Sequence, residues 1–307
     1  MKNIRDFFIL FLFFSLMTYF VMFFKRQQDM LLPENYEKLS QLSHKDRYTI
    51  IWEEEQIRLR LPMEHFLVGA LAATIPVAYE EEMLKAQAIL LRSTLCCRFE
   101  EEKQNGETDV CLTVSAGEWS FWTDRKMQSA WGDQYETNLK KCTDAVLQTQ
   151  GMYLTHDLRP VEGFFHAMSA GKTRSRKILS SGEKLGYLKE TVCADNLSDL
   201  QYEEEIFLPA DRVGELSEGT FDEGGYLISV KRDGELISGE QLRDWLGLAS
   251  SNISWKKEGK NYCFKVRGKG HGFGLDQYYG NRLAQKGKDY REILETFFED
   301  ITFQRVE

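Results

Sequence analysis

Residues 61–76 of this 307-residue chain read LPMEHFLVGALAATIP, and residues 84–93 read LKAQAILLRS. Small and apolar residues lie on most sides of the stretch from Met63 to Ala73, which predicts a buried helix that Pro76 ends. The acidic run at residues 80–82 indicates a second helix, because negative charge stabilises a helix N-terminus. One face of this second helix is apolar at three- to four-residue spacing: Leu84, Ala88, Leu91 and Leu95.

Helical and extended patterns alternate along the rest of the chain. Helices are predicted at residues 137–149, 238–246, 276–286 and 290–298, and strands at 56–61, 152–155, 161–166 and 262–267. Ser238 and Gln241 form a capping box at the start of one of these helices. The patterns predict an α+β fold, with helices packed on short mixed or antiparallel strands in a single domain over residues 57–307.

The chain begins with an apolar run at residues 7–24. A helix of this length spans roughly 27 Å, close to the hydrocarbon thickness of a bilayer. Lys25 and Arg26 follow with no small-x-small cleavage site, so we expect a retained signal anchor within residues 1–26 and a polar juxtamembrane spacer at 27–56. Lys2 and Arg5 precede the run, so the flanking charges leave open which side of the membrane carries the folded part.

The composition is that of an ordinary globular protein. Hydrophobic residues make up 42% and charged residues 28%, which excludes wholesale disorder. The 39 Lys and Arg residues against 48 Asp and Glu residues give a net charge of -9 at pH 7. Because nucleic-acid affinity comes mostly from cations that neutralise phosphates, we expect no nucleic-acid partner.

Six cysteines leave two interpretations open. No pair has the C-x-x-C spacing of a structural zinc site or redox pair. Their even number is typical of disulfides formed outside the cytoplasm, whereas their spread along the chain is equally typical of buried free thiols. The residues are Cys96, Cys97, Cys111, Cys142, Cys193 and Cys263.

Two further blocks contain glycine, histidine and hydroxyl side chains. Residues 165–173 read FHAMSAGKT, and residues 268–277 read GKGHGFGLDQ. With residues 61–76 and 84–93, they resemble the stage II sporulation protein D family. The corresponding family patterns read V-P-L-E-E-Y-V-x-G-V-V-A-x-E-M-P, L-K-A-Q-A-x-A-x-R-T, Y-H-S-x-S-G-G-x-T and G-x-G-H-G-x-G-M-S-Q. The resemblance keeps the family's order and covers residues 61 to 298.

The resemblance implies a membrane-anchored cell-wall protein with its soluble domain outside the cytoplasm. Members of this family act as lytic transglycosylases on glycan strands of peptidoglycan without stem peptides during engulfment of the forespore. One carboxylic acid protonates the leaving oxygen between N-acetylmuramic acid and N-acetylglucosamine, then helps the muramyl 6-hydroxyl close a 1,6-anhydro ring. The implied partners are these denuded strands and other cell-wall enzymes of sporulation.

The sequence departs from the family at the residue expected to catalyse. Thr74 occupies the position of the family's proposed catalytic glutamate, and losing general acid catalysis typically costs about 10²–10⁴-fold in rate. Asp276 stands where the family has serine, so it is either a relocated acid or the N-terminal cap of a helix. Glu64 is a poorer candidate because it points about 80° away from Thr74 on a continuous helix. The acidic run at 80–82 is expected to be a solvated first turn.

The predicted substrate-binding residues come from the two glycine-containing blocks: His166, Ser169, Gly171, Thr173, His271, Gly272 and Gln277. We expect the two histidines to face one polar cleft as neutral imidazoles that orient sugar hydroxyls or bind a metal. No cofactor is predicted from the residues. The resemblance leaves zinc as an alternative, with Cys193 as the nearest third ligand.

Two other clusters have both a structural and a functional interpretation. Four cations, Lys172, Arg174, Arg176 and Lys177, are expected to lie in a solvated loop or to contact muramyl carboxylates. An aromatic platform of Trp119, Phe121, Trp122 and Trp131 is either part of the core or a stacking surface for sugar rings. Two classes of function therefore remain: an active glycan-cleaving enzyme, and a noncatalytic protein that binds glycan strands or a partner enzyme.

Overall fold

The computed structural model describes residues 48–55, 57–104, 111–174, 185–195 and 202–306. The predicted membrane anchor and most of the predicted spacer lie outside these residues. Within the described ranges, no helix is both long and apolar enough to cross a membrane. All six cysteines fall in the described ranges and are free thiols, which agrees with the second of the two interpretations above.

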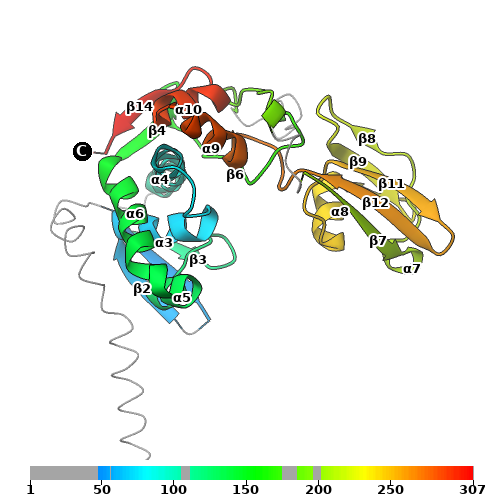
Figure 1. Cartoon of the computed structure of the whole chain (residues 1–307), viewed down its shortest axis with the longest axis horizontal. Helices are drawn as coiled ribbons and strands as arrows, with labels where there is room; N and C mark the ends of the chain where they lie inside the picture. The colour runs from blue at the N-terminus through cyan, green and yellow to red at the C-terminus, as the bar shows by residue number, and fades with distance from the viewer. Residues whose placement is uncertain (1–47, 56, 105–110, 175–184, 196–201, 307) are drawn as a thin grey trace, which may run out of the picture. The chain divides into compact units, whose positions relative to one another are not determined.

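The chain divides into two compact units. The first combines the residues up to Thr74 with Asp109–Leu147, and the second combines Ile75–Thr108 with Gln148–Glu307. Both units contain helices and strands, so the predicted α+β class is confirmed (Figure 1). The single domain predicted over residues 57–307 thus includes parts of both units.

The first unit is built on a three-stranded sheet. Its central strand β1 (Thr49–Glu54) pairs antiparallel with β2 (Ile57–Pro62) and parallel with β3 (Cys111–Ser115). Ile50 and Trp52 alternate with more exposed neighbours and are buried, as expected for a half-buried strand. The folded part therefore begins before residue 57, the boundary expected from composition.

Three α-helices complete the first unit: α3 (Met63–Thr74), α5 (Asp124–Trp131) and α6 (Tyr135–Gln148). The predicted buried helix is α3, in which every residue from Met63 to Ala72 is buried. Helix α6 corresponds to the helix predicted at residues 137–149, and its inner face carries Leu139, Cys142 and Val146, which are almost fully buried.

The second unit contains the long helix α4 (Glu81–Gln104), which packs against β4 (Met152–His156), α9 (Gln277–Gln285) and α10 (Tyr290–Phe297). Strand β4 pairs with β14 (Thr302–Arg305) and β5 (Arg159–Pro160). The four predicted apolar positions of α4 are buried. Arg92 is also fully buried, and its guanidinium donates to the Met152 carbonyl at 2.9 Å, which ties α4 to the sheet.

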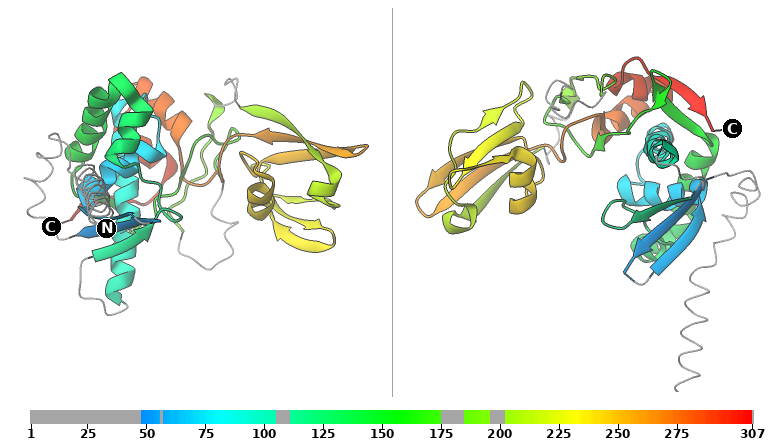
Figure 2. Two further views of the ribbon diagram at one scale, coloured as in Figure 1. Left: turned by 90° about the horizontal axis from the view of Figure 1, so that it is seen from below. Right: turned by 180° about the vertical axis from the view of Figure 1, so that it is seen from behind.

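Two further small sheets of the second unit share a hydrophobic core with helix α8 (Gly239–Leu246) (Figure 2). One contains β11 (Ile253–Glu258), β12 (Asn261–Arg267) and β7 (Glu203–Pro209), and the other contains β10 (Glu235–Ser238), β9 (Leu227–Arg232) and β8 (Thr220–Phe221). The short helix α7 (Ala210–Val213) follows β7. The predicted capping box of Ser238 and Gln241 is present at the start of α8.

A short parallel pair brings the two glycine-containing blocks together. Strand β6 (Phe165–His166) pairs with β13 (Leu275–Asp276), and His166 is the register partner of Asp276. The strand predicted at 161–166 is thus shorter than expected. Its first half bends because the Phe164 N–H donates to the Glu162 carbonyl at 3.1 Å, and a Cβ on Gly163 would lie 2.4 Å from the Leu90 carbonyl oxygen.

Candidate functional site

His166 and Asp276 form the centre of a buried polar cluster. His166 Nε2 lies 3.9 Å from Asp276 Oδ2, and neither side chain is exposed. His166 Nδ1 lies 3.0 Å from the Phe273 carbonyl oxygen, so Nδ1 carries the proton and donates it there. Burial lowers the pKa of His166, although the Asp276 carboxylate opposes this effect. The imidazole is therefore neutral, and its Nε2 has no hydrogen-bond partner in the described structure.

Asp276 caps helix α9. One carboxylate oxygen accepts the Tyr279 N–H at 2.9 Å, and the other accepts the Ser169 N–H at 2.8 Å. The predicted capping role is confirmed. Because both oxygens accept backbone N–H groups and the side chain is fully buried, the geometry favours the capping role over that of a catalytic acid.

His271 lies next to His166, as the sequence predicts. The two ring centroids are 5.7 Å apart, and His271 Nδ1 accepts the Phe273 N–H at 3.1 Å. Burial is the largest cause that lowers the pKa of His271 to about 3, and the electrostatic effects of the neighbouring His166, Arg243 and Arg174 act in the same direction. Both histidines are thus neutral near pH 7, in agreement with the predicted state.

Two glycines make this arrangement possible. Gly270 has φ +106°, and a Cβ there would lie 2.7 Å from His166 Cβ. Gly272 has φ +81°, and a Cβ there would lie 2.6 Å from the Tyr226 ring. Any side chain at either position is excluded both by backbone conformation and by lack of space. The predicted substrate-binding Gly272 therefore has a structural role in the loop.

The 165–173 block is held by hydrogen bonds within the protein. The backbone N–H groups of Ser169 and Ala170 donate to Asp276 and to the Tyr226 hydroxyl, the latter at 2.8 Å. Gly171 accepts the Cys193 N–H at 2.8 Å through its carbonyl, and the Thr173 hydroxyl donates to the Lys189 carbonyl at 3.1 Å. Ser169 and Thr173 are fully buried. This geometry gives these predicted substrate-binding residues a structural function.

Gln277 links this block to α4. Its side-chain amide donates to Gln87 Oε1 at 3.1 Å, and both residues are buried. Cys193 is buried beside the cluster, and its thiol donates to the Thr191 carbonyl at 3.6 Å. Burial and the neighbouring carboxylate raise the pKa of this thiol, so it remains protonated. Among the described residues, no group of three or more His, Cys, Asp and Glu side chains is arranged so that it could hold a metal ion.

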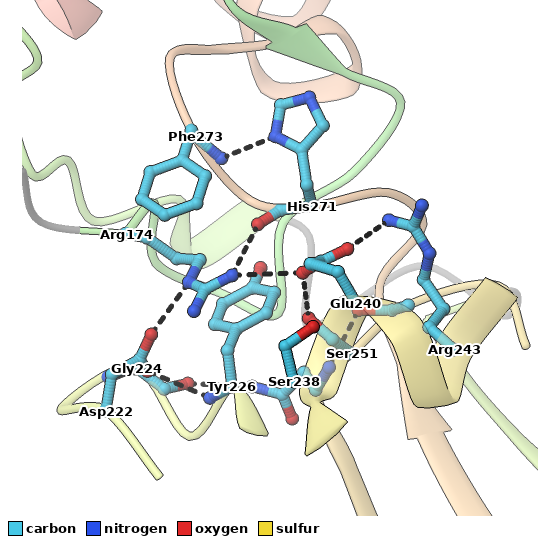
Figure 3. A network of polar contacts seen from close by, with 12 residues as sticks. Arg174, Asp222, Gly224, Tyr226, Ser238, Glu240, Arg243, Ser251, His271 and Phe273 are labelled. Atoms are coloured by element: carbon cyan, nitrogen blue, oxygen red, sulfur yellow. Dashed lines mark hydrogen bonds and ion pairs between the residues drawn. The ribbon is translucent and has the colours of Figure 1, made fainter. Parts of the chain in front are cut away.

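Arg174 was expected among solvated cations, but its side chain is 4% exposed. Its Nε donates to Asp222 at 2.7 Å, and one terminal nitrogen lies 3.1 Å from Glu240 and 3.3 Å from the His271 carbonyl (Figure 3). The guanidinium also lies over the rings of Tyr226 and Phe273. This network connects the histidine loop to the turn between β8 and β9, which holds Asp222, and to α8, which holds Glu240. These partners lie too far along the chain for sequence patterns to reveal the network. Lys172 pairs with Glu190 at the surface, whereas residues 176 and 177 lie outside the described ranges.

Thr74 ends α3 in the first unit. Its hydroxyl donates to the Ala70 carbonyl at 2.8 Å, the usual back-bond of a helical threonine. His166, His271 and Asp276 belong to the second unit, so the expected convergence of Thr74 with them stays a prediction. Glu64 is 1% exposed within α3. Glu82 pairs with Lys85 and accepts the Tyr290 N–H, which makes it part of the packing around α4.

A hollow of about 590 Å³ opens in the first unit beside the end of α3. Its lining includes Ala73, which directly precedes Thr74, and three of the four residues of the predicted aromatic platform, Trp119, Phe121 and Trp122. Trp131 does not line the hollow, but its ring centroid lies 6.0 Å from that of Trp122. The hollow is also lined by three residues that are not among the predicted site residues: Glu54, Arg125 and Lys126. Arg125 and Lys126 follow Thr123, whose position as N-cap of α5 was the available signal.

Together these features define an α+β protein with a glycine-rich loop that encloses two neutral histidines. Residues 53–156 match the family model SpoIID, described as stage II sporulation protein. The chain is 26% identical over 252 residues to stage II sporulation protein D of Bacillus subtilis (strain 168), covering 78% of this chain and 73% of the relative. It is also 26% identical over 256 residues to stage II sporulation protein D of Bacillus amyloliquefaciens, covering 78% and 74%. The family model and the likeness to these two relatives over most of the chain support assignment to the stage II sporulation protein D family.

Proposed function

We propose that this chain is a membrane-anchored cell-wall protein that binds denuded glycan strands of peptidoglycan during sporulation, with its folded part outside the cytoplasm. One observation carries the proposal. An aromatic hollow large enough for a sugar residue adjoins the position of the family's glutamate, and that position holds Thr74. The site thus keeps a surface for a sugar ring and has a hydroxyl in place of the acid.

The same position argues for binding without cleavage. Lytic transglycosylase chemistry needs a group that gives a proton to the leaving N-acetylglucosamine oxygen and removes one from the muramyl 6-hydroxyl as the 1,6-anhydro ring closes. A threonine hydroxyl does not exchange protons in this way near neutral pH, and the Thr74 hydroxyl is already bonded to Ala70. Asp276, the alternative acid, is fully buried.

A second candidate function is cleavage through a carboxylate other than the one the family uses. It is favoured by Glu54, an exposed carboxylate that lines the same hollow as Ala73. In that case Glu54 would act first as acid and then as base.

Cosedimentation of the full-length chain in detergent with insoluble denuded peptidoglycan tests the proposal. We expect the wild-type protein to sediment with the glycan and the supernatant to contain no anhydromuramyl ends by mass spectrometry. Absence of sedimentation would overturn the binding function. Anhydromuramyl ends that disappear in Glu54→Gln would replace it with the second candidate.

A further inference from the structure

Strand β7 lies at the edge of its sheet. In the order β11–β12–β7, strand β12 pairs with one side of β7, and no strand among the described residues pairs with its other side (Figure 1). Most residues of β7 are exposed. An edge of this kind presents a row of unpaired N–H and C=O groups, to which a further strand can bind.

The hydrogen bonds at both ends of β7 identify the backbone groups that point to this free edge. The Ala210 N–H donates to the Lys260 carbonyl just beyond one end, and the Tyr202 carbonyl accepts the Gly268 N–H just beyond the other, both at 2.8 Å. Because alternate residues of an antiparallel strand bond to opposite sides, the even-numbered residues of β7 bond to β12 and the odd-numbered residues point away from it. Pro209 fits this assignment, because a proline in a sheet is placed where its missing N–H needs no partner strand.

The odd-numbered side chains of β7 lie on the outer face of the sheet, since the even-numbered apolar side chains pack on the hydrophobic core. Phe207 is 58% exposed on this outer face. The two odd-numbered carboxylates form ion pairs with β12: Glu203 lies 2.7 Å from the Arg267 guanidinium, and Glu205 lies 3.1 Å from the Lys265 ammonium. These cations offset the acidic charge of the edge, and Phe207 remains as its exposed apolar side chain.

A second copy of β7 complements this edge. If a two-fold axis passes through Phe207, each Phe207 lies opposite the other, and each Glu205 lies opposite Pro209 of the second copy. The two Phe207 residues then exchange both backbone hydrogen bonds, and each Glu205 N–H donates to a Pro209 carbonyl. Directly opposed aromatic side chains stabilise an antiparallel pair. The two Glu205 carboxylates lie four residues apart along the strands, about 14 Å, which exceeds the screening length of about 8 Å at physiological ionic strength.

We infer that two copies of this chain associate through β7, so that the three strands of each copy form one continuous antiparallel sheet with Phe207 at the two-fold axis. A contact of the same patch with itself closes, so association stops at the dimer. A single pair of edge strands is a small interface, and the dimer should therefore be reversible. The inference goes beyond the proposed function and does not depend on it, because β7 takes no part in lining the hollow.

Sedimentation equilibrium of the full-length chain in a density-matched nonionic detergent tests the association. The protein mass of the wild type should rise from one chain to two over about a hundredfold range of concentration. Phe207→Arg should weaken the association by about tenfold, because it removes the aromatic pair and places two cations opposite each other. Leu236→Arg is the matched control, because it adds the same charge at a residue of β10 that is 66% exposed and should leave the association unchanged. A wild type that stays monomeric, or equal weakening by both variants, would overturn the inference.

Disulfide trapping tests the position of the axis and does not require Phe207→Arg to fold. Phe207→Cys places two thiols opposite each other with Cα atoms about 5.5 Å apart, within the range of a disulfide. Cys263 is the register partner of Phe207 within one chain, so Cys263→Ala is added to prevent an internal disulfide. Phe221→Cys in the same background is the control, because Phe221 is 42% exposed and lies outside β7. Mild oxidation should yield a covalent dimer of the first variant only. Equal yields from both variants, or no dimer of the first, would overturn pairing at Phe207.

Discussion

The backbone N–H of Ser169 donates to Asp276 at 2.8 Å, across a separation of 107 residues along the chain. This bond joins two sequence blocks that look like ligand-binding loops because they are rich in glycine and hydroxyl groups. In the folded chain their polar groups bind each other. The blocks therefore shape the protein, whereas the hollow beside α3 is lined by other residues.

Asp276→Ala should reduce the free energy of unfolding by about 2–4 kcal/mol, because it removes the cap of α9 and leaves the buried Ser169 N–H without an acceptor. Asp276→Ser, which introduces the family's residue, should cost less because a serine hydroxyl still caps a helix. Urea unfolding of both variants measures the difference. A loss below about 0.5 kcal/mol for the alanine variant would contradict the structural role.

Arg174→Ala should be among the most destabilising single substitutions, at about 3–5 kcal/mol, since it leaves the buried Asp222 carboxylate without its cation. Arg174→Lys should recover only part of this loss, because lysine lacks the planar fork that reaches Asp222 and Glu240 together. Lys172→Ala is the matched control, because its ion pair with Glu190 is partly exposed and should contribute about 1 kcal/mol or less. Equal unfolding midpoints for Arg174→Ala and Lys172→Ala would refute the buried network.

Stability should fall as the pH decreases below 6.5. The pKa of His271 is lowered from 6.5 to about 3 in the folded state. As the pH falls, His271 of the unfolded chain therefore binds a proton at a higher pH than His271 of the folded chain. The contribution of neutral His271 to the free energy of unfolding is complete above pH 6.5. It is lost as the pH falls toward 3, by up to about 1.4 kcal/mol per pH unit. Urea unfolding at pH 7 and pH 5 should show this loss in the wild type and a smaller one in His271→Asn. The same pH dependence in both proteins would show that His271 is not the group responsible.

Thr74→Glu should introduce lytic transglycosylase activity if the absence of an acid at this position is what prevents cleavage. Anhydromuramyl ends released from denuded strands are measured by mass spectrometry, with Thr74→Gln as a control of equal size that cannot donate a proton. Restoring general acid catalysis is worth about 10²–10⁴-fold. Equal product from the Glu and Gln variants, or none from either, would show that more than one group separates this chain from an active enzyme.

In our proposal the predicted anchor at residues 1–26 holds the chain in the membrane, with the folded part outside the cytoplasm. A protease that does not cross membranes should then remove an epitope fused to the C-terminus when it is added to intact protoplasts. A cytoplasmic control protein should survive the same treatment. Protection of the epitope until the membrane is permeabilised would place the folded part in the cytoplasm and rule out a wall ligand.

The sequence by itself predicts the elements that local interactions specify. Helix α3 is visible in its run of small and apolar residues, α4 and α6 in their apolar periodicity, and the start of α8 in its capping box. Each of these signals is local in the chain. The proximity of His166 and His271 could also be predicted, because both lie in sequence blocks that resemble the family. Their separation along the chain alone would not have indicated it. Strand β1 lies within the predicted polar spacer, because its acidic end conceals the alternation of Ile50 and Trp52 with more exposed neighbours.

Tertiary structure alone decided which polar residues are buried. Arg174 is a cation in a basic stretch of sequence, and it becomes an interior residue because Asp222 and Glu240, 48 and 66 residues away, supply the opposite charges. Glu54, Arg125 and Lys126 come together for the same reason, since β1 and α5 meet only when the first unit folds. Burial of a charge depends on partners that are distant along the chain, and local patterns contain no information about them.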